Sequence, residues 1–164
     1  MTIVNHLNVV SFTPTLWFED VEIGYKIPPL PKCATKQQLV MYAGASGDFV
    51  PIHYDINAAK GAGHDEVIIH GALKSAWLAQ MITLWAGINS QIMEFEVEYR
   101  AVDFPGEELV CQGEVTKKFL SDLYGVIELK IGLFKETGKV STPGKVKLAL
   151  PSRTFHKKEL GLHD

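Results

Sequence analysis

The segment from residue 71 to residue 87, GALKSAWLAQMITLWAG, limits the possible folds more than any other part of the chain. Its apolar residues recur at helical spacing, and Leu78 and Ile82 widen the apolar face at its flanks. The residues at that spacing are Leu73, Ala76, Trp77, Met81, Leu84 and Trp85. A helix that is apolar around so much of its circumference must be largely buried. The rest of the chain is therefore expected to enclose this helix.

After this helix the apolar pattern changes to a period of 2, which is typical of strands with one wet face. The clearest strand is QIMEFEVEYRAVDF, residues 91–104, in which apolar and charged residues alternate. Its predicted inward residues are Met93, Phe95, Val97, Tyr99 and Ala101. Similar alternation follows at Leu109, Cys111 and Val115, at Ile127, Leu129, Ile131 and Leu133, and at Val146, Leu148 and Leu150. Turn signals at Pro105-Gly106, Asp122, Gly138 and Pro143-Gly144 separate the strands and predict an antiparallel sheet.

The segment before the long helix is predicted to be irregular, with short elements. Residues 18–31, FEDVEIGYKIPPLP, indicate an entry strand closed by a proline-rich bend. Thr35 and Gln38 have the spacing of a capping box, which predicts a helix from Thr35 to about Gly44–Gly47. Residues 48–70 are expected to form a loop with a short helical piece around Ile56–Lys60. A buried helix followed by an antiparallel sheet predicts an α+β domain in which the sheet wraps the helix.

Charge and cysteine content exclude several functional classes. The net charge of −3 and the pI of about 6.1 provide no broad basic field, so no nucleic-acid partner is expected. Cys33 and Cys111 form no CxxC pair, which favours reduced thiols and a cytoplasmic location. The N-terminus lacks the features of a secretory signal, and no segment approaches the ~20 apolar residues that span a bilayer, so no membrane insertion is expected.

Residues 42–55, YAGASGDFVPIHYD, and residues 67–73, VIIHGAL, carry the most specific motifs. They resemble the MaoC-like, R-specific enoyl-CoA hydratase family, whose motif is SGDxNPxH followed by His-Gly at the start of the central helix. Within that family the chain looks most like the mycobacterial type of hydroxyacyl carrier-protein dehydratase subunit. The resemblance implies a single hot-dog domain over residues 18–153, with an N-terminal extension at 1–17 and a C-terminal tail at 154–164. It also implies that Asp48 and His53 are catalytic.

The proposed chemistry explains why these residue types are needed. Addition of water to a 2-enoyl thioester requires one group that takes a proton from water and another that protonates the α-carbon. Asp48 and His53 suit these two tasks because Pro51 bends the segment and allows both side chains to face one water. Gly71 suits a third task, since an N–H at a helix N-terminus can bind the thioester oxygen. The sequence leaves open which of Asp48 and His53 is the base.

Two neighbouring residues are predicted to support the site. Ser46 is expected to satisfy the loop or Asp48 with its hydroxyl, because no GxSxG motif surrounds it. His70 is expected to be a buried hydrogen-bonding residue that fixes the loop. Tyr42 and Trp77 are expected to be core aromatics. Valine at position 50 departs from the asparagine that is usual in the family, which puts full activity in doubt and suggests altered acyl specificity or different bracing of the loop.

No metal and no cofactor are predicted. The histidines and aspartates between residues 48 and 70 match no established zinc spacing, and neither GxGxxG nor GxxxxGK[ST] occurs. The expected substrate is an acyl-CoA or acyl carrier protein thioester. Two other functions stay open, a non-catalytic acyl-binding subunit of a heterodimer and a hot-dog thioesterase. A homodimer or a heterodimer of hot-dog subunits is expected, because a single hot dog leaves an open sheet edge.

Overall fold

The computed structural model describes residues 15–121 and 123–155. The predicted turn at Asp122, the tail from residue 156 onward and residues 1–14 of the predicted extension lie outside the described residues. The helical elements are η1 (Phe18–Asp20), α1 (Lys36–Ser46), η2 (Pro51–His53), α2 (Ile56–Gly61) and α3 (Gly71–Ala86). The strands are β1 (Lys26–Lys32), β2 (Gln91–Val97), β3 (Leu109–Leu120), β4 (Gly125–Lys135) and β5 (Val140–Leu150).

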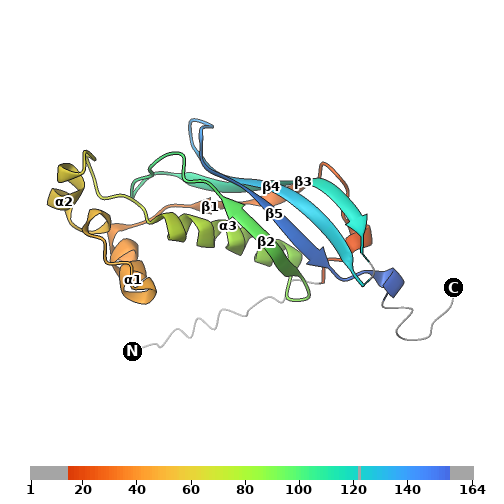
Figure 1. The fold of residues 1–164 in the computed structure, drawn as a ribbon. Helices are drawn as coiled ribbons and strands as arrows, with labels where there is room; N and C mark the ends of the chain where they lie inside the picture. The colour runs from red at the N-terminus through yellow and green to blue at the C-terminus, as the bar shows by residue number, and fades with distance from the viewer. Residues whose placement is uncertain (1–14, 122, 156–164) are drawn as a thin grey trace, which may run out of the picture.

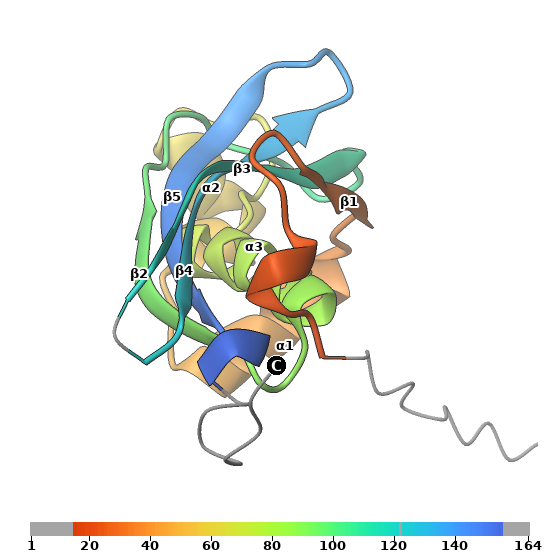
Figure 2. The same ribbon diagram turned by 90° about the vertical axis from the view of Figure 1, so that its right-hand side faces the viewer.

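A single antiparallel sheet with strand order β1-β3-β4-β5-β2 curves around α3 (Figures 1 and 2). This arrangement confirms the predicted α+β hot-dog fold. The strands β3, β4 and β5 follow one another as neighbours, whereas β2 pairs with β5 at one edge. The helices α1 and α2 lie together at the end of the molecule where α3 begins (Figure 1). No helix within the described residues is long and apolar enough to cross a membrane.

The core forms between α3 and the inner face of the sheet, as the apolar pattern predicts. Leu78 and Ile82 of α3 are fully buried, as are Ile127, Leu133 and Leu148 of the sheet. Two of the apolar residues predicted for the helix face, Ala76 and Leu84, are instead exposed. Lys74 takes a buried position on α3, where only 2% of the residue is exposed. The apolar stripe of α3 is therefore narrower than predicted and includes one charge.

The proline-rich segment forms a strand, and the prediction of a bend there is wrong. Pro28, Pro29 and Pro31 lie within β1, while residues 18–20 form the short helix η1. Proline is compatible with β1 because this strand is at the edge of the sheet, where missing N–H groups break few ladder bonds. The register between β1 and β3 shifts between Ile27 and Leu30, which is the position of two of the prolines.

Strand β2 is shorter than predicted, and its pattern contains an irregularity. The register against β5 shifts between Ile92 and Glu94, so Ile92 packs against the core while Met93 is 42% exposed. A β-bulge adds one residue and reverses the facing of the side chains before it. Beyond Val97 the chain continues beside β5 through hydrogen bonds from Glu98 and Arg100, but it is no longer a regular strand.

Pro143-Gly144 does not form the predicted turn, because both residues lie inside β5. A Cβ built on Gly144 would lie 2.5 Å from the backbone oxygen of Glu96. The glycine therefore permits the close approach of β2 to β5. The turn at Gly138 is confirmed, and its φ of 79° explains the choice of glycine.

Candidate active site

The end of helix α1 determines the position of Asp48. The side chain of Thr35 accepts a hydrogen bond from the backbone N–H of Gln38 at 3.1 Å and caps the start of the helix. Such a cap is worth about 1 kcal/mol. The helix ends at Gly47, whose φ of 77° falls in the left-handed region that glycine adopts most readily. Asp48 follows directly, with 37% of its side chain exposed.

Pro51 makes the segment between Asp48 and His53 compact. Val50 has an extended backbone, as expected before a proline, and residues Pro51–His53 form the short helix η2. The Val50 N–H points toward Asp48 Oδ1 at 3.4 Å, so the turn is braced through the backbone. This contact does not use the side chain of Val50, a residue that is 49% exposed. The bend predicted from Pro51 is thus present.

The ring of His53 is oriented by a backbone carbonyl. His53 Nδ1 lies 2.8 Å from the carbonyl oxygen of Ile68, and a carbonyl can only accept. Nδ1 therefore carries the proton in the neutral ring, and the lone pair resides on Nε2. That Nε2 lies 4.0 Å from Asp48 Oδ2. The structure thus brings together the two predicted catalytic side chains, with a free imidazole lone pair beside a partly exposed carboxylate.

His70 is fully buried and contacts both members of this pair. Its ring stacks on that of His53, with centroids 3.8 Å apart and planes inclined by 20°. Its Nε2 lies 3.4 Å from the backbone oxygen of Asp48, while no described residue pairs with its buried Nδ1. Burial, and next the neighbouring His53, lower the pKa of His70 below its usual value. His70 is therefore favoured in its neutral form.

Gly71 begins α3, as predicted, directly after His70. No side chain caps this helix, and none of the hydrogen bonds among the described residues uses the N–H of Gly71. A Cβ on Gly71 would lie 3.0 Å from two ring atoms of Tyr99. The free N–H suits an oxyanion, since the positive end of the helix dipole lies here. The aromatic ring forms one wall beside it.

Ser46 lies in the last turn of α1, where its hydroxyl bonds to backbone groups. Its hydroxyl donates to the backbone oxygen of Tyr42 at 2.7 Å and accepts from the N–H of Asp48 at 3.3 Å. The second bond holds the backbone of Asp48 at the end of the helix. Tyr42 is only partly buried, and its ring meets that of His70 in an edge-to-face contact with centroids 5.0 Å apart. Tyr42 therefore packs against the core from the side of the site.

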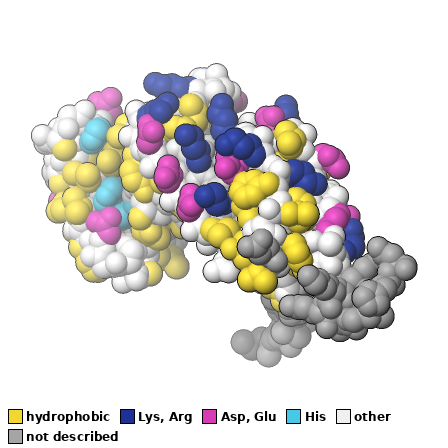
Figure 3. All heavy atoms as spheres, turned by 45° about the vertical axis from the view of Figure 1, so that its right-hand side comes forward, with side chains coloured by type: hydrophobic (Ala, Val, Ile, Leu, Met, Phe, Trp, Pro, Cys, Tyr) yellow, Lys and Arg dark blue, Asp and Glu magenta, His cyan; other side chains and the backbone are white. Residues whose placement is uncertain are grey.

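The position of Tyr99 beside the start of α3 was not predicted from the sequence, which placed this residue on the inner face of a strand. Tyr99 is 55% exposed, and its hydroxyl lies 2.6 Å from Ser75 Oγ on the first turns of α3. Other exposed apolar side chains sit close to Asp48 in the sequence, namely Phe49, Val50 and Tyr54. Histidine side chains lie within a largely hydrophobic surface at the end of the molecule that bears α1 and α2 (Figure 3). This surface is suited to an apolar ligand.

Asp48, His53 and His70 each offer a ligand atom, and these atoms lie within 4.8 Å of one another. A metal bound to an imidazole lies close to the plane of the ring. The two imidazoles are stacked in nearly parallel planes, so no nearby point lies in both planes. The two rings therefore cannot hold one ion in this arrangement, and we assign no metal to the cluster.

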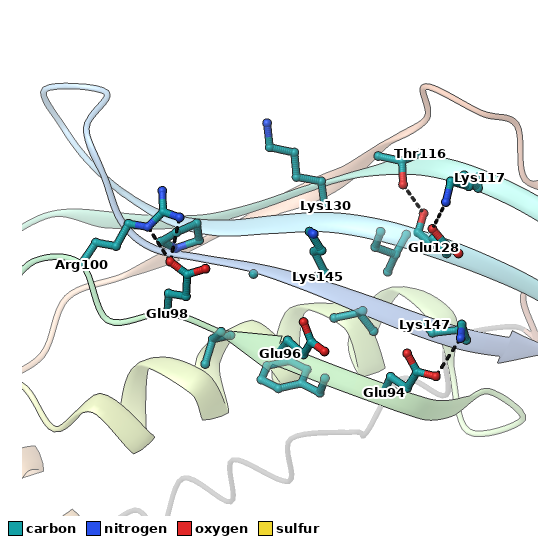
Figure 4. Close-up of a pocket in the computed structure, with 16 residues that line it drawn as sticks. Glu94, Glu96, Glu98, Arg100, Thr116, Lys117, Glu128, Lys130, Lys145 and Lys147 are labelled. Atoms are coloured by element: carbon teal, nitrogen blue, oxygen red, sulfur yellow. Dashed lines mark hydrogen bonds and ion pairs between the residues drawn. The ribbon is translucent and has the colours of Figure 1, made fainter.

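A large hollow on the described residues lies away from this cluster. It has a volume of about 1070 Å³ and covers the face of the sheet opposite α3 (Figure 4). Charged residues from neighbouring strands line it, and some form exposed pairs such as Lys117 with Glu128 and Lys147 with Glu94. None of the candidate site residues lines this hollow. Its size therefore does not indicate the reaction site, and its open charged lining is that of a solvated sheet face.

A sheet wrapped around a central helix, with an Asp/His pair beside the helix N-terminus, defines a hot-dog domain with a candidate acid/base site. A model of the family described as "MaoC like domain" matches residues 20–128. The chain belongs to this MaoC-like dehydratase family.

Individual proteins are similar to this chain in sequence or in fold. The beta subunit of fatty acid synthase from Gibberella zeae is 38% identical over 102 residues, which are 62% of this chain and 4% of that protein. The (R)-hydratase from A. caviae involved in PHA biosynthesis has a similar fold, with a TM-score of 0.74 and 24% identity over 81% of this chain and 99% of that one. The HadBC (3R-hydroxyacyl-ACP dehydratase) complex from Mycobacterium tuberculosis contains another such fold, with a TM-score of 0.63 and 12% identity over 77% of this chain and 96% of that one.

Proposed function

We propose that the chain catalyses the reversible addition of water to a trans-2-enoyl thioester, giving the R-3-hydroxyacyl thioester of coenzyme A or acyl carrier protein. The observation that carries the proposal is the pairing of His53 Nε2 with Asp48 Oδ2 at 4.0 Å, at the start of α3. The R configuration rests on similarity to R-hydratases. The domain is proposed to cover residues 18–153.

Asp48 and His53 would work with one proton shared between them. In hydration the unprotonated member takes a proton from water as the oxygen bonds to the β-carbon. The protonated member gives its proton to the α-carbon, and the pair ends with the same number of protons. Dehydration is the reverse. The tautomer fixed by Ile68 supports this role, because it leaves His53 Nε2 free to gain or lose a proton.

Gly71 would stabilise the negative charge that develops on the thioester oxygen. Its N–H has no partner among the described residues and lies at the positive end of α3. A donor that is already in place costs no reorganisation during the reaction, which is why such donors contribute strongly to rate. Exposed Phe49, Val50 and Tyr54 provide apolar surface for the acyl chain. Ser46 and His70 would support the pair.

We also propose that the chain works as a homodimer or beside an unlike hot-dog subunit. Strand β2 lies at an edge of the sheet and pairs only with β5 among the described residues. An open edge is suited to pairing with another chain. The HadBC complex, which has a similar fold, supports an assembly of hot-dog chains.

The test is an assay of the purified protein on trans-2-enoyl-CoA substrates of increasing chain length, followed by loss of enoyl absorbance and by thiol release. Hydration without thiol release is expected. Thiol release without hydration would show a thioesterase instead. Loss of enoyl absorbance only after addition of a second hot-dog chain would indicate the non-catalytic subunit.

A further inference from the structure

A buried ion pair links the first turns of α3 to the segment that follows β2. Lys74 Nζ lies 2.8 Å from Asp103 Oδ2, and the two residues are only 2% and 0% exposed. Lys74 Nζ also donates to the backbone oxygen of Ala101 at 2.9 Å. On the other side of Asp103, Lys135 Nζ lies 3.2 Å from Oδ1 and 2.8 Å from Glu107 Oε2. Burial of charges is costly unless they are paired, so this cluster requires an explanation.

The backbone of Asp103 is connected to the catalytic histidine through one strap, residues 67–70. The N–H of Ile69 donates to the carbonyl oxygen of Asp103 at 2.9 Å. The N–H of Ile68 donates to Ile52 at 3.1 Å, and the carbonyl of Ile68 accepts from His53 Nδ1 at 2.8 Å. The strap is thus held between Asp103 on one side and the turn that carries His53 on the other. Displacement of Asp103 would move the carbonyl that fixes the tautomer of His53.

Lys74, the other member of the ion pair, contacts the first turn of α3. The backbone N–H of Lys74 bonds to the carbonyl of His70 at 3.3 Å, which forms part of the first turn of α3. The side chain of Lys74 joins that turn to the segment containing Tyr99, whose ring lies 5.6 Å from Nζ and would lie 3.0 Å from a Cβ on Gly71. Lys74 therefore fixes the position of the N-terminus of α3 relative to the wall beside it.

We infer that Lys74 and Asp103 are positioning residues for the active site, holding the Ile68 carbonyl against His53 and the first turn of α3, which begins at Gly71, against the segment that contains Tyr99. This inference rests on the proposed acid/base role of His53 and Asp48. A hydrophobic pair of similar volume is often as stable as a buried ion pair. Stability alone therefore does not require these charges. A fixed position of residues 67–70 does require them, because the ion pair sets both the distance and the orientation between Lys74 and Asp103.

The experiment uses the double variant Lys74→Met/Asp103→Leu, which removes both charges and leaves Lys135 paired with Glu107. The ring nitrogens of His53 are followed by ¹⁵N NMR, and kcat and KM are measured on an enoyl thioester. We expect a loss of the single Nδ1–H tautomer and a fall in kcat of roughly 10- to 100-fold, with a smaller change in KM, as small displacements at a site produce. The exposed pair Glu94 and Lys147, changed to Glu94→Gln/Lys147→Gln, is the matched control and should alter neither readout.

A folded double variant with the wild-type tautomer and wild-type kcat would overturn the inference. Lys74→Arg, which keeps the positive charge, should retain more of the tautomer than Lys74→Met. In the unmodified protein the Ile69 amide should exchange with solvent as slowly as the buried amides of α3, and rapid exchange would contradict the inference without any variant. The tautomer readout needs no substrate, so absence of hydratase activity in the unmodified protein would refute the proposed function and leave this test intact.

Discussion

The imidazole of His70 stacks on that of His53, with ring centroids 3.8 Å apart, and is completely buried. Two imidazolium ions in that contact would repel each other, and burial adds a further penalty for charge on His70. The two effects both favour a neutral His70, in agreement with its lowered pKa. A neutral neighbour can brace His53 without competing for the proton that the proposed reaction moves.

This neutral histidine predicts a dependence of stability on pH. The unfolded chain binds a proton at residue 70 below about pH 6.5, whereas the folded chain does so only at lower pH because its pKa is lowered. The unfolded state therefore binds more protons in that window, and the free energy of unfolding falls as pH falls through it. Chemical denaturation at pH 7 and at pH 5 should show a smaller fall in His70→Asn than in the wild type. His64→Asn, which removes a partly exposed histidine, is measured beside it, and a fall in His70→Asn as large as that in the wild type would contradict the prediction.

The free N–H of Gly71 predicts separate effects on turnover and on stability. If Gly71 binds the thioester oxygen, the new methyl group of Gly71→Ala should obstruct that oxygen, but it also lies 3.0 Å from ring atoms of Tyr99. The double variant Gly71→Ala/Tyr99→Leu removes much of that second effect. If Gly71 binds the oxyanion, kcat should fall by about 10²-fold in both variants, more than the affinity for a saturated acyl thioester falls. Recovery of kcat in the double variant, or unchanged kcat with a lower Tm in Gly71→Ala, would instead leave Gly71 a packing residue.

Ser46 is predicted to be a supporting residue. In Ser46→Ala the backbone N–H of Asp48 loses its acceptor, and the free energy of unfolding should fall by about 1 kcal/mol. Turnover should stay within roughly tenfold of the wild type, because Asp48 retains the contact with the N–H of Val50. A loss of turnover as large as that caused by removal of His53 would show that the hydroxyl takes part in the chemistry.

The open edge of β2 predicts assembly. Sedimentation of the purified chain at micromolar concentration should give the mass of a dimer, because β2 pairs with another described strand on one side only and the apolar side chains near Asp48 are exposed. A monomer that retains full activity at the same concentration would exclude this prediction.

Periodicity was sufficient to predict α3 and the long strands β3, β4 and β5, since each buries a regular face. The Thr35 cap and the bend at Pro51 could also be predicted, because both depend only on residues that are close in the chain. Periodicity failed at the bulge near Met93 and at Pro143-Gly144, where the conformation depends on the neighbouring strand. A bulge or a close backbone approach leaves only a weak trace in one sequence.

In the candidate site, too, the local features could be predicted and the contacts between distant segments could not. Asp48 and His53 lie in one short motif, and their proximity follows from the turn. The contacts of His53 with Ile68 and of Lys74 with Asp103 join distant segments, and sequence spacing contains no information about them. A lysine within an apolar helix face was the one available signal for the buried pair, because such a lysine is rarely buried without a partner.

The most direct test of the account compares wild-type protein with Asp48→Asn and His53→Gln in the hydration of a trans-2-enoyl-CoA, with chiral analysis of the product. The account predicts that the wild type forms the R-3-hydroxyacyl thioester, and that each variant stays folded but loses about 10²- to 10⁴-fold in turnover, as expected for loss of a general acid or base. Circular dichroism and Tm of the same preparations establish that the variants are folded. Turnover near that of the wild type in both folded variants would contradict the assignment of Asp48 and His53 as the catalytic pair.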